Sequence, residues 1–189
     1  MADDVKRQIT ELLPRLRRFA RALTGDQDRA DDLVQETCLR ALSRLDQWER
    51  GTRLDSWMYR IAQNIWLDRG RAARVRGDPV ELEDAIEVSG EDGRATTESR
   101  LVLAEVERAM GRLPEEQRVV VGLVCVEGMS YADAADVIGV PVGTVMSRLA
   151  RARRALFVAT HGEPPEDRAG GRAGERSNQA ESKVGPAQR

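Results

Sequence analysis

The amino-acid sequence predicts an all-α protein with two small helical domains: an N-terminal bundle of three to four helices and a C-terminal helix-turn-helix domain. Apolar residues recur at three- and four-residue spacing in two blocks of the chain. An acidic segment with weak periodicity, containing Pro79, Gly90 and Gly93, separates the blocks. Aromatic residues make up only 4% of the chain, so leucine, valine, isoleucine and alanine must form the cores, which suits small helical bundles.

Three amphipathic helices are expected in the first block, over residues 5–23, 28–45 and 54–74. Pro14 should bend the first helix or mark a restart. Both cysteines, Cys38 and Cys125, lie within apolar helical patterns and are expected to be buried small hydrophobes. The inward-facing residues on the second helix are predicted to be Ala30, Leu33, Val34, Cys38, Ala41, Leu42 and Leu45.

The composition predicts four segments: a first domain over 1–76, a linker over 77–97, a second domain over 98–161 and a tail over 162–189. Residues 78–98 hold eight acids against the single Arg94, which indicates an extended, flexible, acidic linker. The tail is rich in Gly, Pro, Glu, Arg, Ser and Gln, with Val184 as its one aliphatic residue, so it is expected to be disordered.

Helical periodicity resumes near Thr97, and a fresh helix start is predicted at Leu113-Pro114-Glu115-Glu116. Residues 119–126 are apolar on nearly every side. Their β-branched content alone would also allow a strand, but the flanking helical patterns favour a buried helix.

A helix-turn-helix is predicted over residues 130–156. Ser130, followed three residues later by Asp133, resembles a capping box, so a short helix should begin near Tyr131. Gly139 is suited to end that helix in a left-handed conformation, and Val140-Pro141 forms the turn before the next helix.

The second of these helices carries four arginines and no acid. One face is apolar and should pack. Arginine can read guanine edges or hold phosphates, and short hydroxyls fit near the groove floor, so the other face predicts DNA binding; a merely solvated basic face is the alternative. The candidate residues that contact DNA are Thr144, Ser147, Arg148, Arg151 and Arg154.

Other functions find little support in the composition. The net charge is only −2, and the two cysteines and His161 have no zinc-ligand spacing. The N-terminus lacks an apolar signal core, and no apolar run approaches transmembrane length. These features predict a cytoplasmic, non-enzymatic protein with no cofactor, no catalytic or metal site, no small-molecule substrate and no membrane insertion.

Two blocks of the sequence resemble the extracytoplasmic-function group of bacterial sigma factors. The C-terminal block, GVPVGTVMSRLARARRAL with the preceding LPEEQRVVVGLVCVEGMSYADAADVI, resembles that group's sigma-four-like domain for the upstream promoter element. DRADDLVQETCLRAL and DSWMYRIAQNIWLDRGRAARVR resemble its polymerase-binding helix and its helix that melts and reads the downstream element, in a sigma-two-like domain. The resemblance covers about residues 5–160, in the family's order.

The resemblance implies specific contacts. Polar positions of the second helix would face core RNA polymerase, although from composition alone they could be a solvated acidic face; these are Asp31, Asp32, Gln35 and Glu36. Asn64 and the loop 48–53 would read the downstream element, with at least one base flipped out. The candidate residues for that element are Trp48, Arg60, Gln63, Asn64, Arg69 and Arg71, with Arg74 and Arg76 as further phosphate contacts.

By this resemblance, the partners are core RNA polymerase, promoter DNA and an anti-sigma factor that clamps between the domains. Three readings compete. The first is a promoter-specific initiation factor. The second is a helix-turn-helix transcriptional regulator with a dimerising N-terminal domain, and the third is a sigma mimic that titrates an anti-sigma protein without initiating transcription. Loop 49–53, which is the family's variable specificity loop, does not reveal the promoter sequence.

Overall fold

The computed structural model describes residues 2–77 and 97–162, and all regular structure within them is helical. The prediction of an all-α fold is therefore confirmed for these residues. The acidic linker and the C-terminal tail inferred from composition lie outside the described residues, apart from the linker's two ends and Gly162. No helix among the described residues is both long and apolar enough to cross a bilayer.

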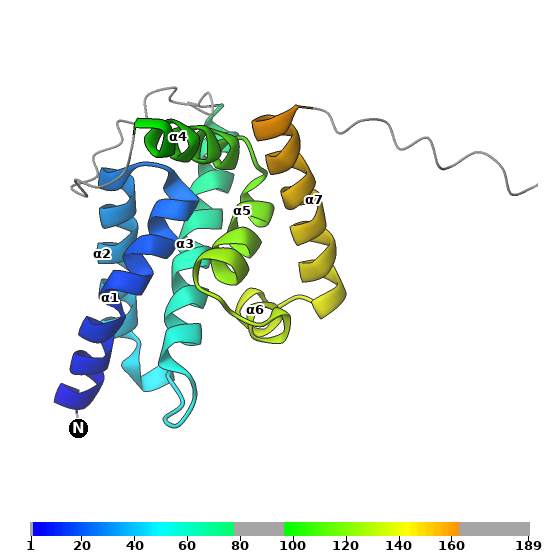
Figure 1. Ribbon diagram of the computed structural model, residues 1–189. Helices are drawn as coiled ribbons and strands as arrows, with labels where there is room; N and C mark the ends of the chain where they lie inside the picture. The colour runs from blue at the N-terminus through cyan, green and yellow to red at the C-terminus, as the bar shows by residue number, and fades with distance from the viewer. Residues whose placement is uncertain (1, 78–96, 163–189) are drawn as a thin grey trace, which may run out of the picture.

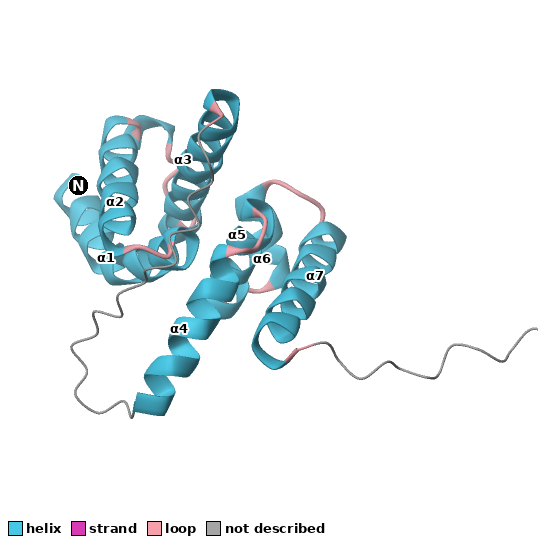
Figure 2. Ribbon diagram, turned by 90° about the horizontal axis from the view of Figure 1, so that it is seen from above, coloured by secondary structure: helices cyan, strands magenta, loops and turns pink. Residues whose placement is uncertain are grey.

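Each of the two domains is a short series of helices. The first contains, in chain order, α1 (Ala2–Thr24), α2 (Gln27–Ser43), the 3-10 turn η1 (Leu45–Gln47) and α3 (Leu54–Arg76). The second contains α4 (Thr97–Gly111), α5 (Glu115–Val121), the π-helical turn η2 (Gly122–Val126), α6 (Tyr131–Ile138) and α7 (Val142–His161). In Figure 1, α1–α3 lie on one side and α5–α7 on the other, and α4 crosses one end. The view from above separates the same two groups (Figure 2).

Capping residues explain where the helices of the first domain begin and end. Asp26 caps α2, its carboxylate accepting a hydrogen bond of 2.7 Å from the Arg29 amide. Gly77 ends α3 in the left-handed region, at φ 69°. The sequence allowed either a bend or a restart of the helix at Pro14. The helix does not restart, since α1 continues through Pro14 without a break. Pro14 and Thr10 are both exposed, so water can solvate the Thr10 carbonyl that loses its helical partner.

Three burial predictions are wrong. Leu42 belongs to the predicted inward stripe of α2, but it is 43% exposed. Cys125 was expected to be buried and is exposed, while Cys38 is half-buried. Val126, at the end of the supposed buried helix, is also exposed, because the helix widens into the π-helical turn η2 and turns this end toward the surface.

The helix-turn-helix has the predicted caps. Ser130 Oγ accepts a hydrogen bond of 3.0 Å from the Asp133 amide, and α6 begins at the next residue, Tyr131. Gly139 ends α6 with φ 75°, a conformation that glycine adopts without steric cost. Val145, Leu149 and Ala152 bury one face of α7.

The two domains pack against each other and share one continuous apolar core. The core includes Phe19 of α1, which is completely buried and whose ring meets the Tyr59 ring edge-on with centroids 5.1 Å apart. Gly122 of the second domain lies directly on the Phe19 ring: a Cβ atom at Gly122 would stand 2.9 Å from two ring carbons. A residue without a side chain at this point allows η2 to approach α1 closely.

Candidate nucleic-acid and partner interfaces

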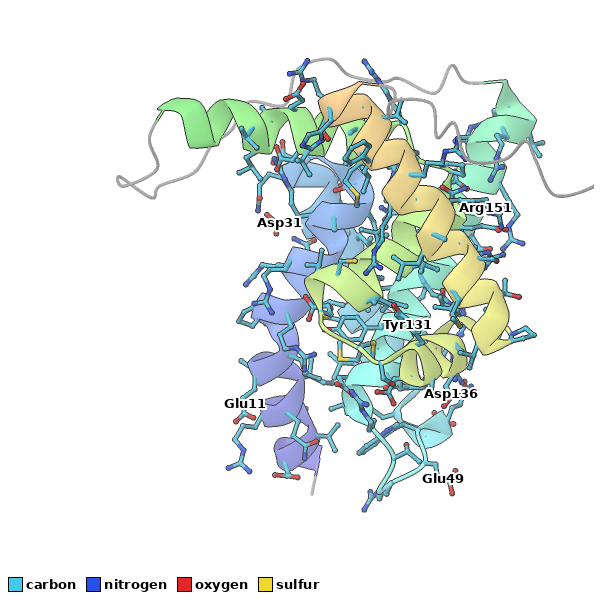
Figure 3. The ribbon with its side chains drawn as sticks, turned by 45° about the vertical axis from the view of Figure 1, so that its right-hand side comes forward. Glu11, Asp31, Glu49, Tyr131, Asp136 and Arg151 are labelled. Atoms are coloured by element: carbon cyan, nitrogen blue, oxygen red, sulfur yellow. The ribbon has the colours of Figure 1, made fainter. Side chains whose placement is uncertain are left out.

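The candidate upstream-element face of α7 is largely open to solvent. Ser147, Arg151 and Arg154 are exposed and Thr144 is half-buried. In Figure 3, Arg151 lies beside the middle of α7, on the right, and Asp31 lies to the left. Arg148 differs from the others, because its side chain is only 17% exposed and it donates a hydrogen bond to the Glu116 carboxylate of α5.

Two apolar residues outside the predicted DNA-contacting set lie at the start of α7. Val142 and Met146 are 41% and 52% exposed. In a helix that enters the major groove N-terminus first, such side chains can contact thymine methyl groups. Neither residue belongs to the stripe formed by Val145, Leu149 and Ala152. This sequence feature could have identified both as exposed apolar side chains.

The candidate polymerase-binding side chains lie on α2. Asp32 and Gln35 are exposed. Asp31 is half-buried and forms an ion pair of 3.6 Å with Arg17. Glu36 accepts hydrogen bonds from Arg40 and Arg69, so its carboxylate is partly neutralised by neighbouring cations.

Leu39 and Leu42 extend the same solvent-facing side of α2. Together with Asp32 and Gln35 they follow helical spacings of three, four and three residues, and Leu39 is 68% exposed. Exposed leucines beside polar and acidic side chains are typical of a surface that binds another protein. The predicted inward stripe wrongly included Leu42, and Leu39 lies outside both that stripe and the predicted polymerase-binding set.

The candidate downstream-element residues divide into two groups. Asn64 is exposed on α3. Arg69 and Arg71 are bonded within the first domain, to Glu36 and Asp68. Trp48 is half-buried and packs against the core.

Arg60 and Gln63 face the second domain. Arg60 donates hydrogen bonds to the carbonyls of Asp136 and Val137, and Gln63, only 2% exposed, donates one of 3.1 Å to Val137. These carbonyls belong to the last turn of α6, the negative end of that helix, which favours the Arg60 cation. With the domains packed in this way, neither side chain is available to a base.

The remaining tryptophans also point inward. Trp57 is half-buried and packs against the core. Trp66 lies under the Arg118 guanidinium, whose central carbon is 5.5 Å from the ring centroid. Arg118 in turn donates to the Leu23 carbonyl of the first domain, and burial lowers its pKa. Trp66 is therefore part of the contact between domains, a role that the sequence alone did not indicate.

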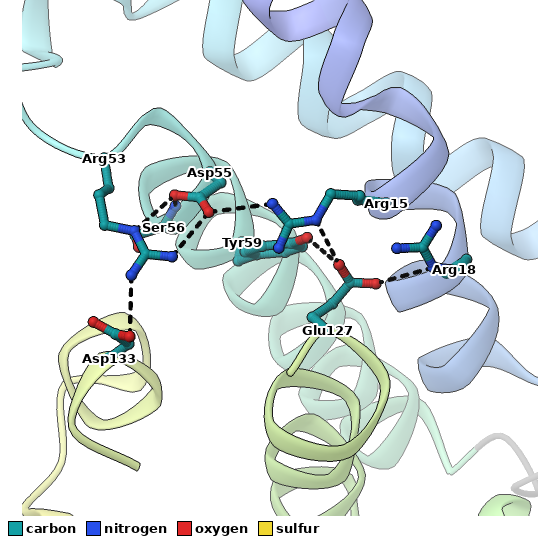
Figure 4. A network of polar contacts seen from close by, with 8 residues as sticks. All are labelled: Arg15, Arg18, Arg53, Asp55, Ser56, Tyr59, Glu127 and Asp133. Carbon is teal, nitrogen blue, oxygen red and sulfur yellow. Dashed lines mark hydrogen bonds and ion pairs between the residues drawn. The ribbon is translucent and has the colours of Figure 1, made fainter. Parts of the chain in front are cut away.

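A polar network centred on Glu127 joins the domains (Figure 4). The Glu127 carboxylate accepts a hydrogen bond of 2.6 Å from the Tyr59 hydroxyl and one of 3.1 Å from Arg15, and lies 3.6 Å from Arg18 Nε. Burial together with Glu127 raises the pKa of Tyr59 well above its usual range. No sequence pattern pointed to this network.

A second part of the network runs through Arg53. Arg53 bonds Asp55 of its own domain and lies 3.0 Å from an Asp133 carboxylate oxygen on α6. Burial alone would raise the pKa of Asp55, but hydrogen bonds from Arg53 and the Ser56 amide, with the charges of Arg53 and Arg15, lower it.

Within the described part of the chain, no group of three His, Cys, Asp or Glu side chains is placed to hold a metal ion. His161 stacks on Phe157 at the end of α7, with ring centroids 4.8 Å apart. The side chains gathered on these surfaces are thus suited to binding: a basic helix face for nucleic acid, and an acidic-apolar helix face for a protein.

Comparisons with known proteins agree with this division. Residues 9–63 match the family model "Sigma2 domain of PhyR", and residues 103–156 match "Sigma-70, region 4". The ECF RNA polymerase sigma factor EcfG of Rhodopseudomonas palustris is 36% identical over 167 residues, covering 88% of this chain and 91% of that protein.

Two solved structures share the fold. The sigma factor RpoE in complex with the anti-sigma factor NepR, from Bartonella quintana, has a TM-score of 0.68 and 31% identity, covering 82% of this chain and 96% of that one. The PhyRSL–NepR complex from Sphingomonas sp. Fr1 has a TM-score of 0.56 and 27% identity, covering 90% and 98%.

These observations define a two-domain, helix-turn-helix protein of bacterial transcription. More specifically, the chain belongs to the family of ECF RNA polymerase sigma factors, and the resemblance inferred from its sequence is confirmed.

Proposed function

We propose that this protein is a non-enzymatic initiation subunit that works in the cytoplasm, brings core RNA polymerase to promoters and helps melt their downstream element. The observation that carries the proposal is the coexistence, in one chain, of a basic recognition helix and an acidic-apolar helix face on separate domains. A DNA-binding regulator needs the first surface; an initiation factor needs both.

The polymerase surface is proposed to be the outer side of α2. Asp32 and Gln35 supply exposed polar groups, and Leu39 and Leu42 supply apolar contact area. Burying two such leucines would contribute on the order of a few kcal/mol, enough to matter beside exposed charges, whose pairs are individually weak.

The promoter surfaces are proposed to be α7 for the upstream element and α3 for the downstream one. Arg151 and Arg154, with Ser147, would contact base edges or phosphates of the major groove. On α3, Asn64 would hydrogen-bond an extruded base, and Arg60 and Gln63 would join it when they are not engaged with α6.

An anti-sigma factor is proposed as a further partner. The related RpoE was solved in complex with the anti-sigma factor NepR, which supports such control of this chain. Val102, Leu103 and Val106 of α4 are all exposed apolar side chains, a surface that suits a protein partner.

A double charge reversal tests the polymerase surface. The Asp32→Arg, Glu36→Arg variant should fail to co-elute with bacterial core RNA polymerase in size-exclusion chromatography, while its circular dichroism matches the parent. The matched control is Asp4→Arg, Glu11→Arg, an equal charge change on exposed positions of α1, which should still co-elute. Unchanged co-elution of the α2 variant would refute the assignment of this surface.

A sigma mimic is the second candidate, favoured by one observation. The first domain matches the family model described as the Sigma2 domain of PhyR, and the PhyRSL–NepR complex shares the fold. A mimic would bind the anti-sigma protein and give no promoter-specific transcript with core polymerase, so a transcription assay separates the two. A helix-turn-helix regulator would bind DNA as a dimer without any core polymerase.

A further inference from the structure

The contact between the two domains contains a carboxylate that is completely removed from solvent. The Glu127 side chain is 0% exposed, and the side chains that surround it with hydrogen bonds or charge, Tyr59, Arg15 and Arg18, all belong to the first domain. A buried carboxylate is costly unless it is paired and hydrogen-bonded, so Glu127 depends on the other domain for its partners.

The local backbone explains how Glu127 reaches this place. The chain widens from α-helix to π-helix over Gly122–Val126, and the Glu127 amide bonds the Gly122 carbonyl five residues earlier at 3.0 Å. Such π turns shift the following side chains around the helix axis, and they occur often at functional sites. Gly122 allows this turn to sit against Phe19, which brings Glu127 between α1 and α3.

The same packing occupies two side chains proposed to read the downstream element. With Glu127 seated, the end of α6 lies on α3, where Arg60 and Gln63 bond the Asp136 and Val137 carbonyls. The outer face of α7 stays exposed, including Ser147 and Arg151. Closure therefore covers Arg60 and Gln63, and it leaves Asn64 and the outer face of α7 exposed.

The interface also has features of a contact that can open. A pocket of about 170 Å³ that is partly open to solvent is lined by residues of both domains, among them Gln63 and Arg148. Gln63 Oε1 and Trp66 Nε1 are buried and find no hydrogen-bond partner among the described residues. A buried polar group without a hydrogen-bond partner disfavours the closed state.

We propose that Glu127, held by Arg15, Arg18 and Tyr59, is an interdomain latch that keeps the chain in a closed state in which Arg60 and Gln63 cannot reach DNA. The inference rests on the proposed function for the DNA roles of Arg60 and Gln63, but the latch itself does not. Release of Glu127 separates α6 from α3 and frees both side chains. The latch thus inhibits, within one chain, the binding of Arg60 and Gln63 to the downstream promoter element.

Small-angle X-ray scattering of the full chain tests the latch without polymerase or DNA. Glu127→Lys places a cation beside Arg15 and Arg18, so the radius of gyration and the maximum dimension should both increase while helical circular dichroism is kept. Glu105→Lys, the same charge change at an exposed position of α4, should scatter like the parent. If Glu127→Lys loses helical signal, the isosteric Glu127→Gln decides by the same measurement. A folded Glu127 variant as compact as the parent would overturn the latch.

The occlusion is tested separately with a fluorescein-labelled single-stranded oligothymidine. Glu127→Gln should bind it several-fold more tightly than the parent, and the gain should disappear when Arg60→Ala is added. If scattering shows an open chain but the affinity is unchanged, the latch stands and the occlusion of a DNA surface is wrong. An open chain with unchanged affinity would count against the proposal that Arg60 and Gln63 of α3 contact DNA. It would leave the proposal that α2 binds polymerase unaffected.

Discussion

A methyl group added at Gly122 probes the contact between the two domains directly. The Cβ atom of Gly122→Ala would stand 2.9 Å from two carbons of the Phe19 ring. Real Cβ atoms do not approach that closely, so either the ring or the backbone must move. The Phe19 side chain is completely buried and held edge-on by Tyr59, so the ring has little room to move.

The magnitude follows from two opposing effects. Overpacking of a well-filled core costs about 1–3 kcal/mol. Replacing glycine by alanine within a helix returns up to about 1 kcal/mol. Gly111→Ala isolates the second effect: Gly111 ends α4 with nothing within 4 Å of the added Cβ. The difference between the variants should therefore be about 1–3 kcal/mol, with Gly122→Ala the less stable.

Thermal unfolding followed by circular dichroism measures the difference. For a chain of this size each kcal/mol shifts Tm by about 2–4 °C, so Gly122→Ala should melt several degrees below Gly111→Ala. Scattering from the folded Gly122→Ala should also show a larger radius of gyration, because separation of the domains relieves the clash. Equal melting temperatures and equal radii would refute the close approach of η2 to α1.

Three further predictions concern DNA, polymerase and pH. Arg151→Ala should weaken binding to upstream-element DNA by roughly 1–3 kcal/mol if it contacts a base, or lower the salt slope by about 1 if it contacts a phosphate. If neither Arg151→Ala nor Arg148→Ala changes DNA binding, α7 does not dock as proposed. Leu39→Asp should reduce core polymerase affinity in a pull-down at unchanged helicity, and wild-type affinity would remove the leucines from the surface. Asp55 has a pKa below its ordinary value, so its contribution to stability is present above about pH 4 and is lost as the pH falls through the folded-state pKa. In urea unfolding, Asp55→Asn should therefore be less stable than the parent near pH 7, and the gap should narrow in acid; a constant gap would contradict the ion-pair assignment.

The helix-turn-helix was predictable from local signals. Ser130 and Gly139 cap α6 as their residue types suggest, and the stripe of Val145, Leu149 and Ala152 is the buried face of α7. Each of these depends on residues close in sequence, where hydrogen-bond and helix geometry leave few alternatives.

The contact between domains was not predictable in the same way. Glu127 meets Arg15 and Tyr59 at sequence separations of 112 and 68 residues, and a single acid after an apolar run has no periodicity that indicates a distant partner. By the resemblance, Gln63 was a candidate residue for contact with the downstream element, yet it is buried and donates a hydrogen bond to Val137 of α6. A position outside the apolar stripe of a helix is exposed within its own domain, but a second domain that packs against it can bury it.

The exposure of Cys125 shows a related limit. Its apolar neighbours predicted burial, but the π turn adds a residue to the helical repeat and changes which side chains face inward. The 3.6-residue period on which the prediction relied does not hold through such a turn.

Transcription in vitro with bacterial core RNA polymerase tests the central claim most directly. DNA that co-purifies with the chain–polymerase complex is sequenced, and a recovered fragment is used as a supercoiled template. The chain should convert core polymerase from non-specific to promoter-specific initiation, with permanganate-reactive thymines in the downstream element and no transcript from the Asp32→Arg, Glu36→Arg variant. Binding to the template without strand opening or a specific transcript would contradict the assignment as an initiation factor.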